Sequence, residues 1–567
     1  AVVAHVAVLL LTAFLALRLT TLLTASHLVS YYEELYRGTI ARELLAGLHA
    51  PLWSYQADHY SGGSIVVGLL AVVPFAILGP SLFALKLVPL AIAAATVALA
   101  VHFLARYFGP RAAIAGAALL VVPPPAVTQL SSIAVGFHPE STLFGVGTLA
   151  LLFAYLYGEP RRRRLLLLAG LVGGLGVWFT YIAAIALVTA AITWVALDRR
   201  RIASRDIVLF GGAAAIGVAP AIAYIVAHGL APGSPSIDEI LLAVDEPALI
   251  RLAKLPARVA KLAVYGLPLS AGFPDFGPMP GLVLSYLYWG LALAVAVPLL
   301  WREARRPVEL MRSRPSLLPL ALYPAVYLAI YAATPLEIPS GTGFIHSRFL
   351  APLQVFGILL LAVAVTRVRA GGLVLTGLLT LGLVGQSALV FKEPPGRALA
   401  HLGYSYVHLG VVWQTRLGSS AAALAAGRRR FDRFGELERT ALYRGAAGET
   451  TSAEALEAQL REVPAAYRPY FLEAFGRELA VEPAIPRVDV AARLGRLPEP
   501  ERTLACHGFE QARAHEAARS GWRELEPRAL IGPPRPCADS TAPLVALGYL
   551  LAEYRHQDEG GAWLRTE

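Results

Sequence analysis

Long apolar runs recur along the first two thirds of the chain, with short polar segments between them. A membrane-spanning helix needs roughly 17–25 mainly apolar residues. Runs of about that length, some shorter and one longer, lie at about 2–26, 65–80, 82–105, 112–128, 140–157, 165–197, 207–228, 281–301, 316–334, 349–366 and 371–391. The first run continues past Arg18 and is too long for the core of a cleaved signal peptide. The pattern therefore predicts an all-α, polytopic membrane protein.

Clusters of basic residues between the runs predict the topology. They lie at Arg161–Arg164, Asp198–Arg201, Trp301–Arg306 and Arg367–Arg369. Positively charged loops face the cytoplasm, so all four clusters should lie on that side. The run 165–197 has a cluster at each end, and as one helix it would be about 50 Å long. We therefore expect a hairpin of two short helices that turns near Thr180.

The run 65–80 is short and contains Pro74. If this run crossed the membrane, every basic cluster after it would face outward, so we expect a surface or re-entrant helix instead. The remaining runs then give about eleven spans. The N-terminus lies in the cytoplasm in this topology.

The topology divides the chain into two predicted domains. Residues 1–391 form the transmembrane domain, with outer loops at 27–64, at roughly 125–140 (the second outer loop) and at 229–280. Residues 392–567 are rich in Ala, Glu and Arg at helical spacing and form an extracytoplasmic α-helical domain. Glycines in similar short pieces recur there at spacings of 31, 32 and 40 residues, at Gly445, Gly476, Gly508 and Gly548. Such spacing is close to the period of a helical-hairpin repeat, and a plain irregular helical domain is the alternative.

Composition supports the membrane assignment. Apolar residues make up 56% of the 567 residues and charged residues 16%, which excludes a soluble enzyme, a disordered chain and a collagen-like fibre. The net charge of +10 does not indicate nucleic-acid binding, because many Arg residues sit beside apolar runs. Arg-for-Lys usage and compact loops favour a prokaryotic plasma (inner) membrane. Cys506 and Cys537 lack metal-ligand spacing, and whether they form a disulfide stays open.

The first outer loop contains two adjacent carboxylates, Glu33 and Glu34. The pKa of one member of such a pair can be raised by its neighbour's charge and by partial burial, which suits a general base. Alternatively, both carboxylates simply begin an amphipathic helix, where they complement the helix dipole. The residues alone leave both interpretations open.

Four segments resemble the GT-C glycosyltransferase superfamily, in its protein-mannosyltransferase and aminoarabinose-transferase branch. Tyr32–Gly47 is similar to the first outer loop, where an acidic pair precedes a Tyr and an Ala-Arg-x-Leu-x-x-Gly helix. Leu78–Pro89, Arg106–Arg111 and Ile345–Pro352 resemble later elements in the same order. The likeness covers about residues 1–390. Glu33 replaces the usual Asp, and Lys86 replaces the usual Arg, which loses a bidentate phosphate contact.

The resemblance implies transfer of a sugar from a polyprenyl-phosphate donor to a protein, lipid or glycan acceptor on the extracytoplasmic face. Glu33 or Glu34 would deprotonate the acceptor, and cations would hold the leaving phosphate. The candidate substrate-binding residues are Lys86, His346 and Arg348 for the phosphate, Asp58 and His59 as a second polar patch, and His138 and Glu140 in the second outer loop. The cations could instead reach the lipid interface, and the histidines could be ordinary loop residues.

Two other functions compete with a transferase. A non-catalytic GT-C-like scaffold would bind membrane-protein partners through residues 392–567. A transporter should show midplane polar residues, whereas the spans here are nearly uncharged. No Gly-rich loop followed by Lys-Ser/Thr occurs, which argues against an ATP-driven pump. No cofactor is certain; a divalent metal stays open, and no nucleic-acid partner is expected.

Overall fold

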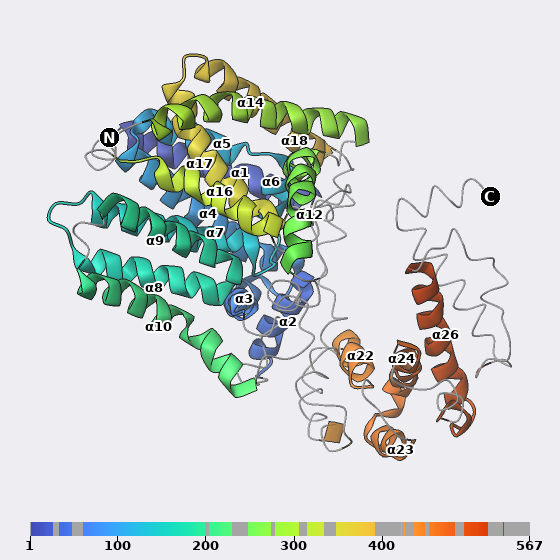
Figure 1. The fold of residues 1–567 in the computed structure, drawn as a ribbon. Helices are drawn as coiled ribbons and strands as arrows, with labels where there is room; N and C mark the ends of the chain where they lie inside the picture. Colours follow the sequence, from blue (N-terminus) through green and yellow to red (C-terminus); the bar gives the residue numbers. More distant parts are fainter. Residues whose placement is uncertain are drawn as a thin grey trace. The chain divides into compact units, whose positions relative to one another are not determined.

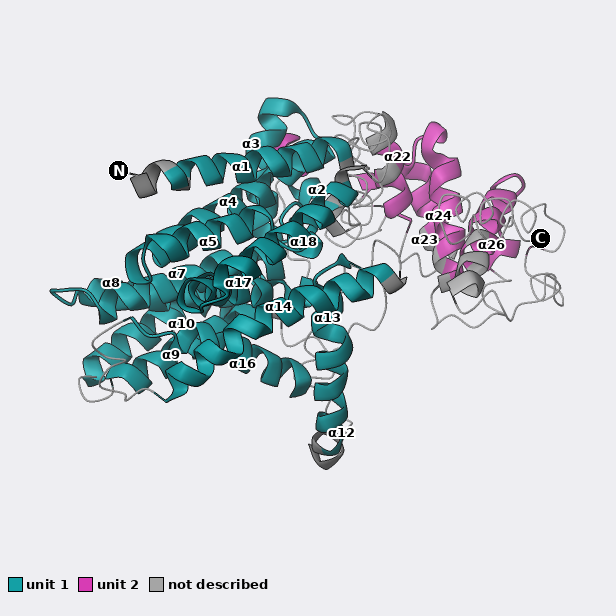
Figure 2. Cartoon of the chain, turned by 90° about the horizontal axis from the view of Figure 1, so that it is seen from above, with its two compact units in different colours: residues 1–42, 51–404 teal, residues 43–50, 405–567 magenta. Residues whose placement is uncertain are grey.

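The structure is a computed structural model and groups the chain into two units (Figure 2). The first unit contains Ala1–Arg42 and Pro51–Tyr404, and the second contains Glu43–Ala50 and Ser405–Glu567. The predicted domain boundary after residue 391 stays a prediction. The structure describes residues 2–25, 33–47, 61–198, 203–228, 248–273, 278–305, 315–333, 348–391, 421, 424–425, 436–447, 453–481, 493–519 and 537.

Regular secondary structure in the described part of the chain is helical, which confirms the all-α prediction (Figure 1). The helices of the first unit are α1 (Val2–Ala25), α2 (Glu33–Leu45, which the division between the units cuts after Arg42), α3 (Gly63–Leu78), α4 (Leu82–Tyr107), α5 (Pro110–Val121), α6 (Pro125–Leu130), α7 (His138–Leu156), α8 (Arg163–Phe179), α9 (Ala184–Asp198), α10 (Ser204–His228), α12 (Ala248–Lys261), α13 (Leu267–Ser270), α14 (Pro278–Ala304), α16 (Leu318–Ala333), α17 (Ala351–Arg367) and α18 (Gly371–Phe391). A 3-10 turn, Tyr181–Ala183, precedes α9, and a π-helical segment, Leu262–Gly266, follows α12.

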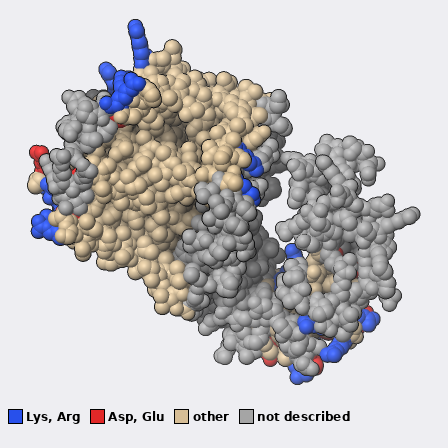
Figure 3. Space-filling model, in the orientation of Figure 1, with Lys and Arg blue, Asp and Glu red and all other residues tan. Residues whose placement is uncertain are grey.

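Seven helices among the described residues are long and apolar enough to cross a membrane. They include α4, α7, α10, α14, α17 and α18, and α9 joined to its preceding turn. Shorter apolar helices occur in α1, α3, α5 and α16. The multi-pass prediction is confirmed. The middle of the face seen in Figure 3 has almost no charged side chains, as a lipid-facing surface requires.

The predicted hairpin in 165–197 is present. Helix α8 ends before Thr180, whose extended backbone (φ −160°, ψ 139°) separates it from the 3-10 turn and α9. One predicted run is interrupted: α5 ends at Val121, and Pro123–Pro125 follow it before the short helix α6. Proline lacks the backbone N–H that would continue the helix and restricts the residue before it, which explains the early end.

Helices α8 and α10 pack closely because glycines line their contact. A Cβ atom on Gly170 would lie 2.2 Å from the Phe210 carbonyl oxygen, and one on Gly174 would lie 2.1 Å from that of Ala214. Small residues at four-residue spacing let membrane helices approach to backbone contact. The glycines of α8 therefore serve helix packing.

The second unit contains α22 (Glu436–Gly445), α23 (Ala453–Glu462), a 3-10 turn (Ala465–Tyr467), α24 (Arg468–Val481) and α26 (Glu501–Arg519). Helices α24 and α26 contact each other through one glycine of each helix, which faces a backbone carbonyl of the other helix. A Cβ atom on Gly476 would lie 1.7 Å from the Ala505 carbonyl oxygen, and one on Gly508 would lie 1.7 Å from that of Glu473. Gly476 and Gly508 are 32 residues apart, and so are Glu473 and Ala505, whose carbonyls they face. This equal spacing favours a helical repeat that relates α24 to α26.

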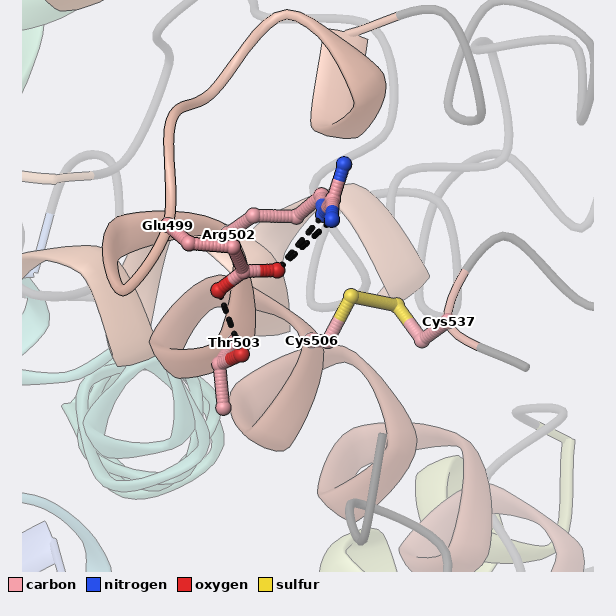
Figure 4. Close-up of a disulfide and its surroundings, with 5 residues drawn as sticks. All are labelled: Glu499, Arg502, Thr503, Cys506 and Cys537. Atoms are coloured by element: carbon pink, nitrogen blue, oxygen red, sulfur yellow. Dashed lines mark hydrogen bonds and ion pairs between the residues drawn. A yellow bond between two sulfur atoms is a disulfide. The ribbon is translucent and has the colours of Figure 1, made fainter. Parts of the chain in front are cut away.

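Cys506 of α26 forms a disulfide with Cys537, with the two Cα atoms 5.5 Å apart (Figure 4). The sequence alone leaves this pairing open. At the start of the same helix, the Glu499 carboxylate accepts hydrogen bonds from the Thr503 hydroxyl at 2.7 Å and the Arg502 guanidinium at 2.8 Å (Figure 4). The Thr503 hydrogen bond is the main reason that the pKa of Glu499 lies below its usual value.

Candidate functional site

Two residues that are 52 positions apart form a buried ion pair. The Lys86 Nζ atom, near the start of α4, donates to Glu34 Oε1 at 2.7 Å and to Glu34 Oε2 at 2.8 Å. Glu34 lies in the first turn of α2, and both side chains are 0% exposed. A buried charge is costly unless a partner and hydrogen bonds compensate it. The pair thus joins two predicted site residues in one charged group.

The backbone of the segment 131–137 completes this group. The Ala134 amide donates to Glu34 Oε2 at 2.9 Å, and the Ser132 carbonyl accepts from Lys86 at 3.3 Å. Hydrogen bonds to charged groups are stronger than neutral ones, so the segment is held in place by both members of the pair. The contact also fixes the segment 131–137 against α2 and α4.

Glu140 is held by the other end of the same segment. Its Oε1 accepts from the Gly136 amide at 2.9 Å, and its Oε2 accepts from the Phe137 amide at 3.3 Å. Glu140 is 3% exposed and sits in the first turn of α7, where a carboxylate complements the helix dipole. These contacts give Glu140 a structural role at the start of α7.

Arg37 is a site residue that sequence reasoning missed. Its guanidinium carbon lies 4.9 Å from the centre of the Phe137 ring, and its charge acts on Glu140. Arg37 is 2% exposed and follows Glu34 by three residues on α2, so the two side chains share a helix face. That spacing, in a loop dense with charges, is the signal that the sequence offers. Arg37 thus packs α2 against the Phe137 ring of the segment 131–137.

Two glycines let the start of α3 touch the segment 131–137. A Cβ atom on Gly63 would lie 1.7 Å from the Gly136 carbonyl oxygen, which leaves no room for any side chain. Gly136 itself has φ +71°, a conformation that favours glycine. The neighbouring Gly62 amide donates to the Trp178 carbonyl at 2.7 Å. The start of α3 is therefore fixed against both α7 and α8.

His138 lies beside this contact and packs against aromatic rings. Its ring centre is 4.9 Å from that of Phe349 and 5.9 Å from that of Tyr181. Arg348 is close enough for its charge to act on His138. The structure thus places the predicted residues His138 and Arg348 near each other. The contacts of His138 on two rings also fit a packing role.

Several buried polar atoms around this contact have no hydrogen-bond partner among the described residues. They are His138 Nδ1, Ser64 Oγ, Trp178 Nε1 and Thr180 Oγ1. They belong to the starts of α7 and α3, the end of α8 and the turn that follows it. Buried polar groups normally have partners, and unsatisfied ones in a native fold call for an explanation such as a ligand or water. Each of these atoms is therefore a candidate partner for water or a polar ligand.

Arg18 lies inside α1 and is fully buried. Its Nε atom donates to the Ser131 hydroxyl at 2.9 Å, and its guanidinium also reaches the carbonyls of Leu120 and Val121 at 3.4 and 3.5 Å. These carbonyls lie at the end of α5, where the helix leaves them without intrahelical partners. Arg18 therefore donates hydrogen bonds to the carbonyls at the end of α5, which is a structural role.

Some predicted site residues fall outside the described residues: Asp58, His59, His346 and the side chain of Glu33. Among the described residues, no group of three or more His, Cys, Asp and Glu side chains could hold a metal ion. Of the predicted residues, the structure brings together Glu34 with Lys86, and His138 with Arg348. Glu140 shares the segment 131–137 with the first pair.

Residues 63–224 match the family model described as dolichyl-phosphate-mannose-protein mannosyltransferase. The match confirms the GT-C resemblance. It includes Lys86, His138 and Glu140, and it supports glycosyltransferase activity in general terms. The chain is also similar to the crystal structure of ArnT from Cupriavidus metallidurans in the apo state, at 15% identity and a TM-score of 0.42 over 88% of this chain and 82% of that one. No curated protein sequence matches the chain.

Proposed function

We propose that the protein transfers a sugar from a polyprenyl-phosphate donor to an acceptor hydroxyl on the extracytoplasmic face of the membrane. The observation that carries this proposal is the buried Glu34–Lys86 pair. It places an acid and a cation together at the start of a spanning helix. A lipid-linked donor presents its phosphate at this depth while its hydrocarbon tail stays in the bilayer.

In the proposed reaction, the acceptor oxygen attacks the anomeric carbon as a carboxylate takes the hydroxyl proton. The bond between the anomeric carbon and the phosphate oxygen breaks, and polyprenyl phosphate leaves. The configuration at the anomeric carbon of the transferred sugar is inverted. Lys86 stabilises the phosphate as its negative charge grows, because a preorganised cation in a water-poor site lowers the barrier. Arg348, beside His138, is the second candidate cation.

The ion pair restricts the role of Glu34. Its Oε2 accepts from both Lys86 and Ala134, and its Oε1 accepts from Lys86. A general base needs an oxygen within hydrogen-bond reach of the acceptor hydroxyl. Glu34 therefore acts as the base only after Lys86 moves to the donor phosphate. Otherwise Glu34 is a positioning residue for Lys86, and Glu33 is the base.

Transfer assays with two single variants separate these roles. The full-length protein in vesicles is given a series of polyprenyl-phosphate sugars, and transfer is measured for wild type, Glu33→Gln and Glu34→Gln. Removal of the base lowers the rate by about 10²–10⁴-fold at a pH where the wild-type carboxylate is ionised. Loss of a positioning residue weakens donor binding, so it raises KM for the donor more than it lowers kcat.

The matched control is Glu159→Gln, an exposed carboxylate after α7, which should leave transfer unchanged. Wild-type rates in both Glu33→Gln and Glu34→Gln would rule out the proposed base. No transfer from any donor would instead favour the non-catalytic scaffold.

The proposed orientation puts the N-terminus in the cytoplasm of a prokaryotic plasma membrane and the C-terminal unit outside. The Cys506–Cys537 disulfide supports this orientation, because disulfides persist in oxidising compartments. The loop joining α7 to α8, which carries the Arg161–Arg164 cluster, lies on the same side of the first unit as the N-terminus (Figure 1). A protease added to intact spheroplasts should cut the C-terminal unit, and its full protection would overturn this orientation.

A further inference from the structure

A groove of about 770 Å³ lies between α4, α7 and α8, and none of its lining residues belongs to the candidate site. Its walls include the apolar side chains of Leu99, Leu151 and Val172, and its mouth includes Arg106, Arg162 and Arg164. Arg106 follows Lys86 by twenty residues on α4, which corresponds to about 30 Å along the helix axis. The groove therefore opens at the end of the spanning helices opposite to the Glu34–Lys86 pair.

The four consecutive arginines before and in α8 divide into two kinds. Arg161 binds Asp198 at 2.6 Å, and Arg163 binds Asp206 at 2.7 Å. The alternate residues, Arg162 and Arg164, line the groove and form no ion pair with any residue that the structure describes. The positive-inside rule explains a basic loop in general but not why alternate charges face one groove.

The charges at the mouth do not cancel. Three arginines and one carboxylate, Glu159, line it, and their sum is +2. His102 also lines the groove and would add to the positive charge when protonated. Arg162, Arg164 and Arg106 are exposed, so an anion can reach them from the membrane surface.

The interior of the groove is apolar and reaches deep between the helices. On α7 it extends from Leu143 to Ala154, which is about 16 Å along the helix. Gly147 contributes to the space, since a Cβ atom there would already lie 3.3 Å from Val172 and 3.7 Å from Leu99. Such a slot accepts a hydrocarbon chain that enters from its charged mouth.

We propose that this groove binds an anionic phospholipid, whose phosphate contacts Arg106, Arg162 and Arg164 and whose acyl chain lies along α7. Basic pockets between membrane helices on the cytoplasmic side bind anionic head groups by this combination of charges and apolar walls. A free phosphate would use only the mouth and leave the apolar slot empty. The proposal does not depend on the transfer reaction, because it concerns the opposite end of the spans.

Lipid titrations of the purified full-length protein test the proposal. Native mass spectrometry measures the dissociation constant for phosphatidylglycerol and for phosphatidylcholine in wild type and in the variant Arg106→Gln/Arg162→Gln/Arg164→Gln. We expect wild type to prefer phosphatidylglycerol and the triple variant to bind it about tenfold or more weakly. A control with the same loss of charge, Arg111→Gln/Arg302→Gln/Arg305→Gln, should keep the wild-type affinity.

A second variant tests the apolar slot without changing any charge. Ala154→Phe fills the groove near its mouth and should also weaken phosphatidylglycerol binding, while both variants elute as monodisperse protein. Equal affinity of wild type and the triple variant would overturn the proposal, as would equal binding of the two lipids. Competition by inorganic phosphate at the lipid's own concentration would also overturn it, because the site would then recognise phosphate alone.

Discussion

The Lys86 ammonium lies 2.7 Å from one Glu34 carboxylate oxygen and 2.8 Å from the other, and neither side chain reaches solvent. The two charges compensate each other, so the loss of either one leaves an uncompensated charge between α2 and α4. An isolated buried charge lowers the stability of the fold by more free energy than a buried ion pair adds to it. Removal of one member of the pair should therefore lower the stability of the protein, whether or not the pair takes part in catalysis.

Lys86→Met should destabilise the full-length protein by about 3–5 kcal/mol, because Glu34 stays buried without a cation. The double variant Glu34→Met/Lys86→Met should recover most of this loss, because apolar side chains of similar volume replace the pair. Thermal unfolding in detergent measures both. An additive double variant, less stable than either single one, would contradict the view that the two residues act as one unit.

Arg461→Gln provides the comparison for that experiment. Arg461 also forms a short ion pair, at 2.7 Å from Glu457, but the two side chains are 74% and 71% exposed. Water compensates the charge that remains on Glu457, so we expect a smaller loss than for Lys86→Met.

Gly63→Ala should disrupt the candidate site through the backbone rather than through chemistry. The new Cβ atom would meet the Gly136 carbonyl oxygen at 1.7 Å, so one of the two backbones must shift; a shift at Gly63 strains the adjacent Gly62–Trp178 hydrogen bond, and a shift at Gly136 strains its hydrogen bond to Glu140. We expect a loss of at least about 1–3 kcal/mol in thermal unfolding. Gly372→Ala is the control, because a Cβ atom at this position would have no neighbouring atom within 4 Å. Equal stability of the two variants would show that the start of α3 and the segment 131–137 are not in contact.

The sequence predicts the helices of the first unit well because the signals are local. Apolar runs, basic clusters and the turn at Thr180 are each visible within a short window. The early end of α5 also has a local signal, since Pro123–Pro125 stand inside the predicted run. Apolar residues alone mark that run as continuous, and only the prolines reveal the break.

The candidate site is harder to predict, because its contacts join distant positions. Glu34 and Lys86 are identified separately from a family resemblance, but nothing in either segment shows that they form a pair. The backbone amides of Ala134 and Gly136 carry no side-chain signal at all, yet they hold the two carboxylates. Arg37 has only a weak signal of its own, because many arginines of this chain lie beside apolar helices.

Gly476→Ala and Gly508→Ala should each separate α24 from α26. In both cases the added Cβ atom would lie 1.7 Å from a carbonyl oxygen of the other helix. Because the contacts are reciprocal, the two variants should lose similar amounts of stability and become similarly sensitive to limited proteolysis in the C-terminal unit. Gly495→Ala, which has open space around it, should resemble wild type. A strong effect of only one glycine would argue against the repeat relation.

Loss of the Cys506–Cys537 disulfide should destabilise the second unit. The bond closes a loop with a sequence separation of 31, and a loop of that length corresponds to about 3–4 kcal/mol of chain entropy. Cys506→Ser/Cys537→Ser in the full-length protein should therefore increase proteolysis of the C-terminal unit, whereas the spanning helices stay resistant in detergent. Reduction of wild type with dithiothreitol should have the same effect, and the serine variant should not respond to it. If reduction changes neither protein, the disulfide contributes nothing to the stability of this unit.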